Sequence, residues 1–150
     1  LNRESDSAVT GLAVLAGVGE GVSLPLARIA AARDLPQAFL SRIFRRLSRH
    51  GILRAKRGRG NGYALARSAH TISLRDVVEA VEGPEVLDRC LLWKEHCSDA
   101  DPCPLHHRLK EVRVRVEEML EDTSLAEYVS DSPHARLRIP DASLQGSDGG

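Results

Sequence analysis

The stretch that decides the fold is residues 36–67, PQAFLSRIFRRLSRHGILRAKRGRGNGYALAR. Apolar residues recur three and four positions apart in its first half, which predicts a helix from Pro36 to a stop at His50-Gly51. Two extended runs follow, residues 52–56 and 63–66, and the turn dipeptide Asn61-Gly62 lies between them. The stretch therefore predicts one helix followed by a β-hairpin.

The flanking segments complete the pattern. Residues 5–17 and 23–33 have helical spacing, and a glycine-rich segment separates them. After the hairpin, residues 73–82 predict a fourth helix that ends at Gly83-Pro84. Helix, helix, helix and hairpin is the order of a winged helix-turn-helix. We therefore predict a mainly α fold with a small β-hairpin wing, and assign residues 1–84 to a DNA-binding domain.

The C-terminal half predicts a dimerisation helix over residues 105–121. Five apolar residues repeat there at spacings of four and three, as in a coiled-coil seam: Leu105, Leu109, Val112, Val116 and Met119. A single winged domain has little room to bury this stripe, so we expect a homodimer, with an intramolecular core helix as the alternative. Residues 124–129 are predicted to form one further helical turn. We divide the rest into a cysteine-bearing loop (85–104), a dimerisation segment (105–130) and a disordered tail (131–150).

The charge distribution points to nucleic acid. The formal net charge is zero, yet residues 24–67 hold eleven basic side chains and one acid. Residues 72–131 hold fifteen acids and seven bases. A basic segment of this kind is the expected footprint of phosphate contacts with double-stranded operator DNA. No apolar run is long enough to span a membrane and no secretory signal is visible, so we expect a cytoplasmic protein.

The second helix of a helix-turn-helix pair places its N-terminal residues against base edges in the major groove. Gln37, Ala38, Ser41 and Arg42 are the candidates for this role. Arg42 suits a guanine and Gln37 an adenine. The other predicted DNA-binding residues are basic: Arg28 on the preceding helix, Arg45, Arg46 and Arg49 for phosphates, and Arg57 and Arg59 on the wing for a minor groove.

Three cysteines, Cys90, Cys97 and Cys103, are separated by six and five residues within the predicted loop. An odd count without an export signal argues against a disulfide framework. Zinc sites use closer pairs of cysteines, and the wider spacing favours a loop that wraps an iron–sulfur cluster. From the residues alone, a cluster, a zinc ion and reactive or idle thiols all remain open.

These segments resemble the bacterial IscR/NsrR/RirA family of iron–sulfur winged-helix regulators over about residues 1–130. The resemblance rests on residues 1–9 (LNRESDSAV), 24–30 (LPLARIA), 39–47 (FLSRIFRRL), 57–63 (RGRGNGY) and 72–83 (ISLRDVVEAVEG), and on the cysteines followed by Pro104-Leu105-His106. It implies a dimeric regulator with one cluster in each subunit near the DNA-binding domain. In that family, loss, oxidation or nitrosylation of the cluster changes operator affinity.

The resemblance leaves two candidates for the fourth cluster ligand. In IscR-like members a histidine three residues after the last cysteine completes a 2Fe–2S site, and His106 stands there. In NsrR-like members an aspartate contributed by the partner subunit completes a 4Fe–4S site, and Asp6 stands at that position. Six residues separate Cys90 and Cys97, whereas five are expected in both IscR-like and NsrR-like members. His106 is slightly favoured. His106 as an exposed helix residue, and Asp6 as a helix-dipole partner, are the structural alternatives.

The leading interpretation is a homodimeric transcription regulator, a repressor, that senses iron, redox state or nitric oxide through an iron–sulfur cluster. The alternative is a zinc- or thiol-based redox-responsive repressor without a cluster. An enzyme with a cysteine nucleophile and His96 or His106 as base has no supporting glycine-rich loop, carboxylate pair or nucleophile elbow. We therefore expect neither an enzyme nor a small-molecule substrate.

Overall fold

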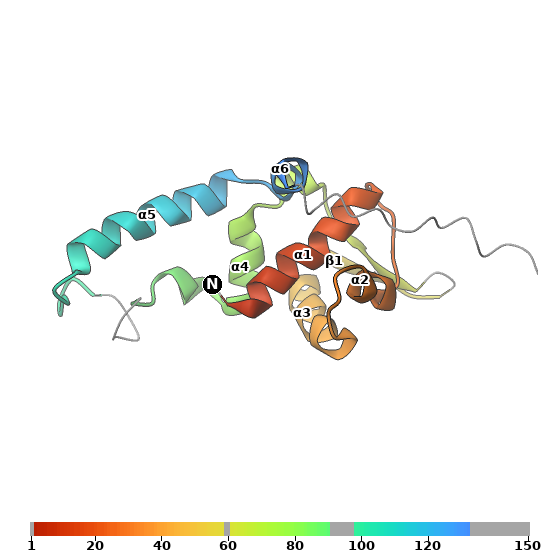
Figure 1. Cartoon of the computed structure of the whole chain (residues 1–150), viewed down its shortest axis with the longest axis horizontal. Helices are drawn as coiled ribbons and strands as arrows, with labels where there is room; N and C mark the ends of the chain where they lie inside the picture. Colours follow the sequence, from red (N-terminus) through yellow and green to blue (C-terminus); the bar gives the residue numbers. More distant parts are fainter. Residues whose placement is uncertain (1, 59–60, 91–97, 133–150) are drawn as a thin grey trace, which may run out of the picture.

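The computed structural model describes residues 2–58, 61–90 and 98–132 of the 150-residue chain. Its elements are α1 (Arg3–Val18), α2 (Leu26–Ala32), α3 (Gln37–Arg49), β1 (Leu53–Lys56), β2 (Gly62–Leu65), η1 (Ala69–Thr71), α4 (Leu74–Glu82), η2 (Pro84–Leu87), α5 (His106–Asp122) and α6 (Leu125–Asp131) (Figure 1). The mainly α fold with a two-stranded hairpin is confirmed. The two 3₁₀ segments were not predicted. Arg59, His96, Cys97 and almost all of the predicted tail lie outside the described residues.

Local signals in the sequence set the helix ends. The Asn2 side chain accepts hydrogen bonds from the backbone N–H groups of the first turn of α1. Ser73 and Asp76 form a reciprocal capping box at the start of α4. Gly51 follows α3 with a φ of 71°, and Gly83 ends α4 with a φ of 95°, a backbone region that glycine enters without steric cost.

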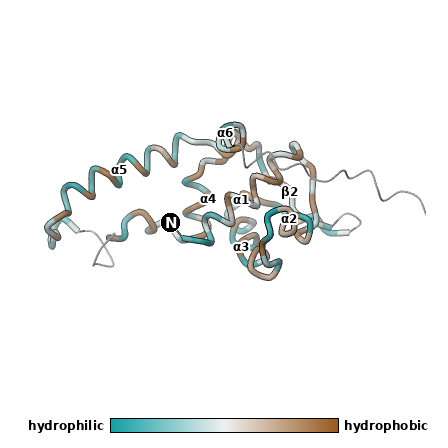
Figure 2. Tube along the Cα trace, viewed as in Figure 1, coloured by the Kyte–Doolittle hydropathy of each residue, from teal (hydrophilic) through white to brown (hydrophobic). Residues whose placement is uncertain are grey.

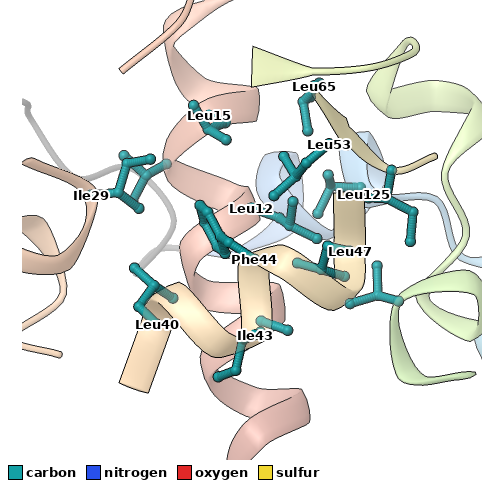
Figure 3. Close-up of a cluster of buried hydrophobic side chains, with 14 of the residues drawn as sticks. Leu12, Leu15, Ile29, Leu40, Ile43, Phe44, Leu47, Leu53, Leu65 and Leu125 are labelled. Atoms are coloured by element: carbon teal, nitrogen blue, oxygen red, sulfur yellow. The ribbon is translucent and has the colours of Figure 1, made fainter. Parts of the chain in front are cut away.

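The hydrophobic core lies where α1, α3 and the hairpin meet (Figure 3). The predicted stripe of α3 is confirmed for Leu40, Ile43, Phe44 and Leu47, which are all fully buried, whereas Phe39 is half-buried at the edge of the core. The Phe44 ring packs edge-on against Tyr63 of β2, with ring centroids 5.1 Å apart. Phe44 is therefore held between α1 and the hairpin, which fixes the orientation of α3.

The wing is tied to the segment before α2. β1 and β2 pair antiparallel, with Leu53 opposite Leu65 and Lys56 opposite Gly62. Leu24 adds an isolated bridge: its N–H donates to the Tyr63 carbonyl at 3.0 Å, and the Tyr63 N–H donates back at 2.9 Å. A Cβ on Gly62 would lie 2.2 Å from the Leu24 carbonyl oxygen, so only glycine permits this approach.

The helix α5 extends away from the body of the molecule, whereas α6 returns to it (Figure 1). Leu125 at the start of α6 is fully buried and belongs to the core that includes α1. Its N–H donates to the Ile72 carbonyl at 2.8 Å, and the Leu74 N–H donates to Thr123 at 2.9 Å. The segment predicted as one further turn of a dimerisation unit is thus a seven-residue helix packed within the same chain.

Candidate nucleic-acid interface and cysteine segment

The outer face of α3 is basic and solvent-accessible. Gln37, Ala38, Arg42, Arg45 and Arg49 are exposed, and the first turn of the helix carries no acidic residue. The fold thus places the predicted base-reading and phosphate-binding side chains opposite the buried stripe. Ser41 is half-buried, and its hydroxyl accepts a hydrogen bond of 3.5 Å from the Arg45 guanidinium.

Arg46 differs from its neighbours because its guanidinium is engaged within the protein. Nη1 donates to the Glu4 carboxylate at 2.7 Å and to the Val81 carbonyl at 3.0 Å. These bonds connect α3 to the start of α1 and the end of α4. The proposed phosphate contact of Arg46 stays a prediction, and the structure adds a role in fixing the helices to one another.

Arg3 was not singled out in the sequence, yet it lies beside α3. Its Cζ atom is 5.7 Å from the centroid of the Phe39 ring, and the Cζ atom of Arg42 is 5.9 Å from the same centroid. Only the folded arrangement of α1 and α3 reveals this pairing, because Arg3 and Phe39 are far apart in the chain. No motif in the sequence indicates it.

Two further basic elements flank α3. Arg28 is exposed on α2, the first helix of the helix-turn-helix pair. Along the wing, Arg54, Lys56 and Arg57 are exposed, and β1 buries only Leu53. The proposed minor-groove contact of Arg59 lies outside the described residues.

The described cysteines lie on either side of the undescribed residues 91–97. Cys90 follows η2 and is half-buried, and Cys103, also half-buried, precedes α5. The Cys103 carbonyl accepts a 2.9 Å hydrogen bond from the backbone N–H of His106. Within residues 2–58, 61–90 and 98–132, no three Cys, His, Asp or Glu side chains cluster as a metal site. Cys97, the middle cysteine, is not among these residues.

His106 is buried, with 2 % of its surface exposed, which corrects the alternative that it is an exposed helix residue. Its Nε2 lies 2.7 Å from a carboxylate oxygen of Asp99, and the Lys110 ammonium donates to the same carboxylate at 2.9 and 3.0 Å. The hydrogen bonds from Lys110 and His106 lower the pKa of Asp99 to about 2. Asp6 is exposed in the first turn of α1.

A family model described as Rrf2, an iron-dependent transcriptional regulator, matches residues 1–131. The chain belongs to the Rrf2 family. It is 33 % identical over 128 residues to the HTH-type transcriptional regulator IscR of Sodalis glossinidius, an alignment that covers 85 % of this chain and 75 % of the relative.

Solved structures of two Rrf2-type regulators share the fold. CymR of B. subtilis superposes with a TM-score of 0.73 at 22 % identity, covering 88 % of this chain and 97 % of CymR. IscR of T. potens superposes with a TM-score of 0.69 at 23 % identity, covering 92 % and 91 %. The relatives are transcription regulators, which confirms a DNA-binding regulator over an enzyme. None of the helices in the described part of this Rrf2 chain is long and apolar enough to cross a membrane.

Proposed function

We propose that this Rrf2 chain is a homodimeric repressor that docks α3 and its wing on double-stranded operator DNA. In this proposal an iron–sulfur cluster held by Cys90, Cys97 and Cys103 senses iron, redox state or nitric oxide. The observation that carries the proposal is the joint presence of a basic, acid-free face on α3 and a cysteine segment joined to α5 beside a buried histidine.

The surface of α5 supports the dimer. Leu105, Val112 and Met119 are 38 %, 51 % and 57 % exposed, and Leu109 and Val116 are half-buried. Hydrophobic and hydrophilic residues alternate along the helix (Figure 2). An exposed apolar stripe at heptad-like spacing is the surface that a second copy of the same helix would cover.

The donor set fits an iron–sulfur cluster, since thiolates and imidazoles are the ligands of such clusters. When bound, the cluster would supply a group whose oxidation state and integrity respond to oxidants, iron supply and nitric oxide. The burial of His106 next to Cys103 supports it as the fourth ligand, while Asp6, which the partner subunit would contribute, is exposed and stays the alternative. Metal-ligating histidines commonly bond a carboxylate through their second ring nitrogen, and Asp99 provides such a carboxylate at 2.7 Å.

A physical route connects the cysteine segment with the DNA-binding face. The end of α4 leads through Gly83 and η2 to Cys90, and the Val81 carbonyl of α4 accepts the hydrogen bond from Arg46 of α3. Ordering of the cysteine segment around a cluster would set the position of α4. In the dimer it would also set the separation of the two α3 helices, which must match half-sites about one helical turn apart.

The test is the absorption and EPR spectrum of anaerobically purified protein, followed by DNA binding of the holo and apo forms at one salt concentration. We expect a coloured protein whose spectrum changes in His106→Ala. His107→Ala is the matched control, because His107 is exposed on the next position of α5. Asp6→Ala tests the alternative ligand. A colourless protein that contains no iron, or equal DNA affinity of the holo and apo forms, would overturn cluster sensing.

A thiol-based switch is the second candidate. The fold neighbours include an oxidized form of CymR of Staphylococcus aureus. In this chain Cys90 and Cys103 are only half-buried. A thiol switch predicts a colourless protein whose DNA affinity changes with peroxide and returns with a thiol reductant. Substitution of Cys103 by Ser would remove this response.

A further inference from the structure

The Phe39 ring gathers two cations from different helices. Arg3 belongs to the first turn of α1 and Arg42 to the middle of α3, and their Cζ atoms lie 5.7 and 5.9 Å from the ring centroid. Arg3 and Arg42 are exposed, and Phe39 is half-buried. The three side chains thus connect the start of α1 with the DNA-facing side of α3.

The charges around the ring are unbalanced. In the part of the chain that the structure describes, neither Arg3 nor Arg42 pairs with a carboxylate, whereas the adjacent Glu4 is taken by Arg46 at 2.7 Å. The negative face of an aromatic ring attracts a guanidinium, but it does not neutralise it. Two like charges held at one ring therefore form a local positive centre, and an anion is the ligand that such a centre attracts.

We propose that Arg3 binds a phosphate of the DNA backbone beside the base edges that α3 reaches, and that Phe39 holds Arg3 and Arg42 in place. This inference rests on the proposed docking of α3 in the major groove. Arginine presents planar donors that match phosphate oxygens, and the ring limits the conformations of both side chains before DNA arrives. A phosphate contact adds affinity without sequence preference, whereas Arg42 reads a base.

The first experiment measures the salt dependence of binding by fluorescence anisotropy. The probe is a mixed-sequence duplex of about 30 base pairs, which accommodates two half-sites one helical turn apart. Loss of one phosphate contact lowers the slope of log affinity against log salt by about 0.9. Because the proposed homodimer carries two copies of Arg3, we expect a decrease of about 1.8 for Arg3→Ala. Arg115→Ala is the control, because it removes the same charge from an exposed position on α5 and should leave the slope unchanged.

The second experiment separates affinity from specificity. A duplex selected by the wild-type protein from a randomised pool is compared with the mixed-sequence duplex. Arg3→Ala should weaken binding to both by the same factor, whereas Arg42→Ala should reduce their ratio. Phe39→Leu keeps an apolar residue at the edge of the core and removes the ring. In the double variant, the losses of affinity from Phe39→Leu and Arg3→Ala should be less than additive, because both variants lose the Arg3 side chain that the ring holds in place.

The outcomes distinguish this inference from the docking on which it depends. If Arg3→Ala has the slope of wild type while Arg42→Ala reduces the ratio, the docking stands and the role of Arg3 is refuted. If neither variant differs from the Arg115→Ala control, the docking of α3 is refuted together with the role of Arg3. Full additivity of Arg3→Ala and Phe39→Leu would refute the role of the ring.

Discussion

The pairing of the wing with the segment before α2 predicts a large effect of Gly62→Ala. The added Cβ would lie 2.2 Å from the Leu24 carbonyl oxygen, 2.4 Å from the Leu24 carbonyl carbon and 2.9 Å from the Pro25 nitrogen. All three are backbone atoms, so no side-chain rotation relieves the clash. The chain at Leu24 must move away from β2 to accommodate the methyl group.

The magnitude follows from the contacts that this movement breaks. Leu24 and Tyr63 exchange two backbone hydrogen bonds, at 2.9 and 3.0 Å. Each contributes a net stabilisation of about 0.5–1.5 kcal/mol, so their loss costs about 1–3 kcal/mol. The lower backbone entropy of alanine in the unfolded chain returns about 0.4–1 kcal/mol. Partial exposure of Leu24, now 8 % exposed, adds to the cost, and we expect a net destabilisation of about 1–3 kcal/mol.

The assay is urea denaturation followed by circular dichroism, at one protein concentration because a dimer's stability depends on it. Two glycine variants are controls. Gly17 is helical with nothing within 4 Å of an added Cβ, so Gly17→Ala should stabilise by about 0.5–1 kcal/mol. Gly51 has open space but a φ of 71°, so Gly51→Ala should cost about 1–2 kcal/mol from backbone strain alone. The reasoning is refuted if Gly62→Ala is as stable as wild type.

Four further predictions concern other parts of the molecule. Ser124→Ala removes the N-cap of α6 and should destabilise by about 0.5–2 kcal/mol in the same assay. Hydrogen bonds from Ser124 lower the pKa of Glu127 below its ordinary value of 4.5. The ionised Glu127 carboxylate therefore stabilises the fold fully above pH 4.5, and this stabilisation is lost as the pH falls through the lowered pKa. Glu127→Gln should make stability less dependent on pH in this range. Arg46→Met removes the ion pair with Glu4, and because the Arg46 side chain is 39 % exposed, the expected cost is only about 1–2 kcal/mol. Met119→Glu places a charge in the exposed stripe of α5 and should convert the proposed dimer to a monomer in sedimentation velocity.

The variants at Arg46 and Met119 each have a nearby control. Arg49→Met changes an exposed arginine of the same helix and should leave stability within about 0.5 kcal/mol. Glu118→Gln lies next to Met119, is exposed, and should leave the oligomeric state unchanged. A monomeric wild-type protein at micromolar concentration would contradict the dimer. A urea denaturation curve of Ser124→Ala that matches wild type would show that the cap contributes nothing.

The parts of the fold that sequence reasoning predicted well depend on neighbouring residues. Residues 73–82 were predicted as a helix, and α4 is Leu74–Glu82 with Ser73 as its cap. The helix after Pro36 was equally clear, since its apolar period is intact from Phe39 to Leu47. In both, the residues that begin and end the helix are only a few positions from the pattern that indicates it.

The features that were missed depend on which distant segments meet. The bridge between Leu24 and Tyr63 is a backbone contact that neither the sequence before α2 nor that of the hairpin predicts. The bond from Arg46 to Glu4 joins residues 42 positions apart, and nothing in the sequence distinguishes Arg46 from the other three arginines of α3. The alternative of an exposed His106 was wrong, since the side chain is buried and its Nε2 lies 2.7 Å from Asp99, a contact that the sequence does not indicate.

The length of α5 means that a small rotation of the helix produces a large displacement of its far end. Its 17 residues extend about 25 Å. The C-terminal end is joined to the core, where Leu120 and Leu125 are buried and Arg75 of α4 pairs with Glu121 at 2.8 Å. The N-terminal end contacts the cysteine segment, where buried His106 lies 2.7 Å from Asp99. A rotation of α5 by roughly 5° about its C-terminal end moves its N-terminal end by about 2 Å, given a rise of about 1.5 Å per residue. If two copies pair along α5, a small angular change at Thr123 is converted into a larger change in the span between two DNA-binding domains. Substitutions near Thr123, rather than in the core, would then change the spacing of half-sites that the dimer can bind.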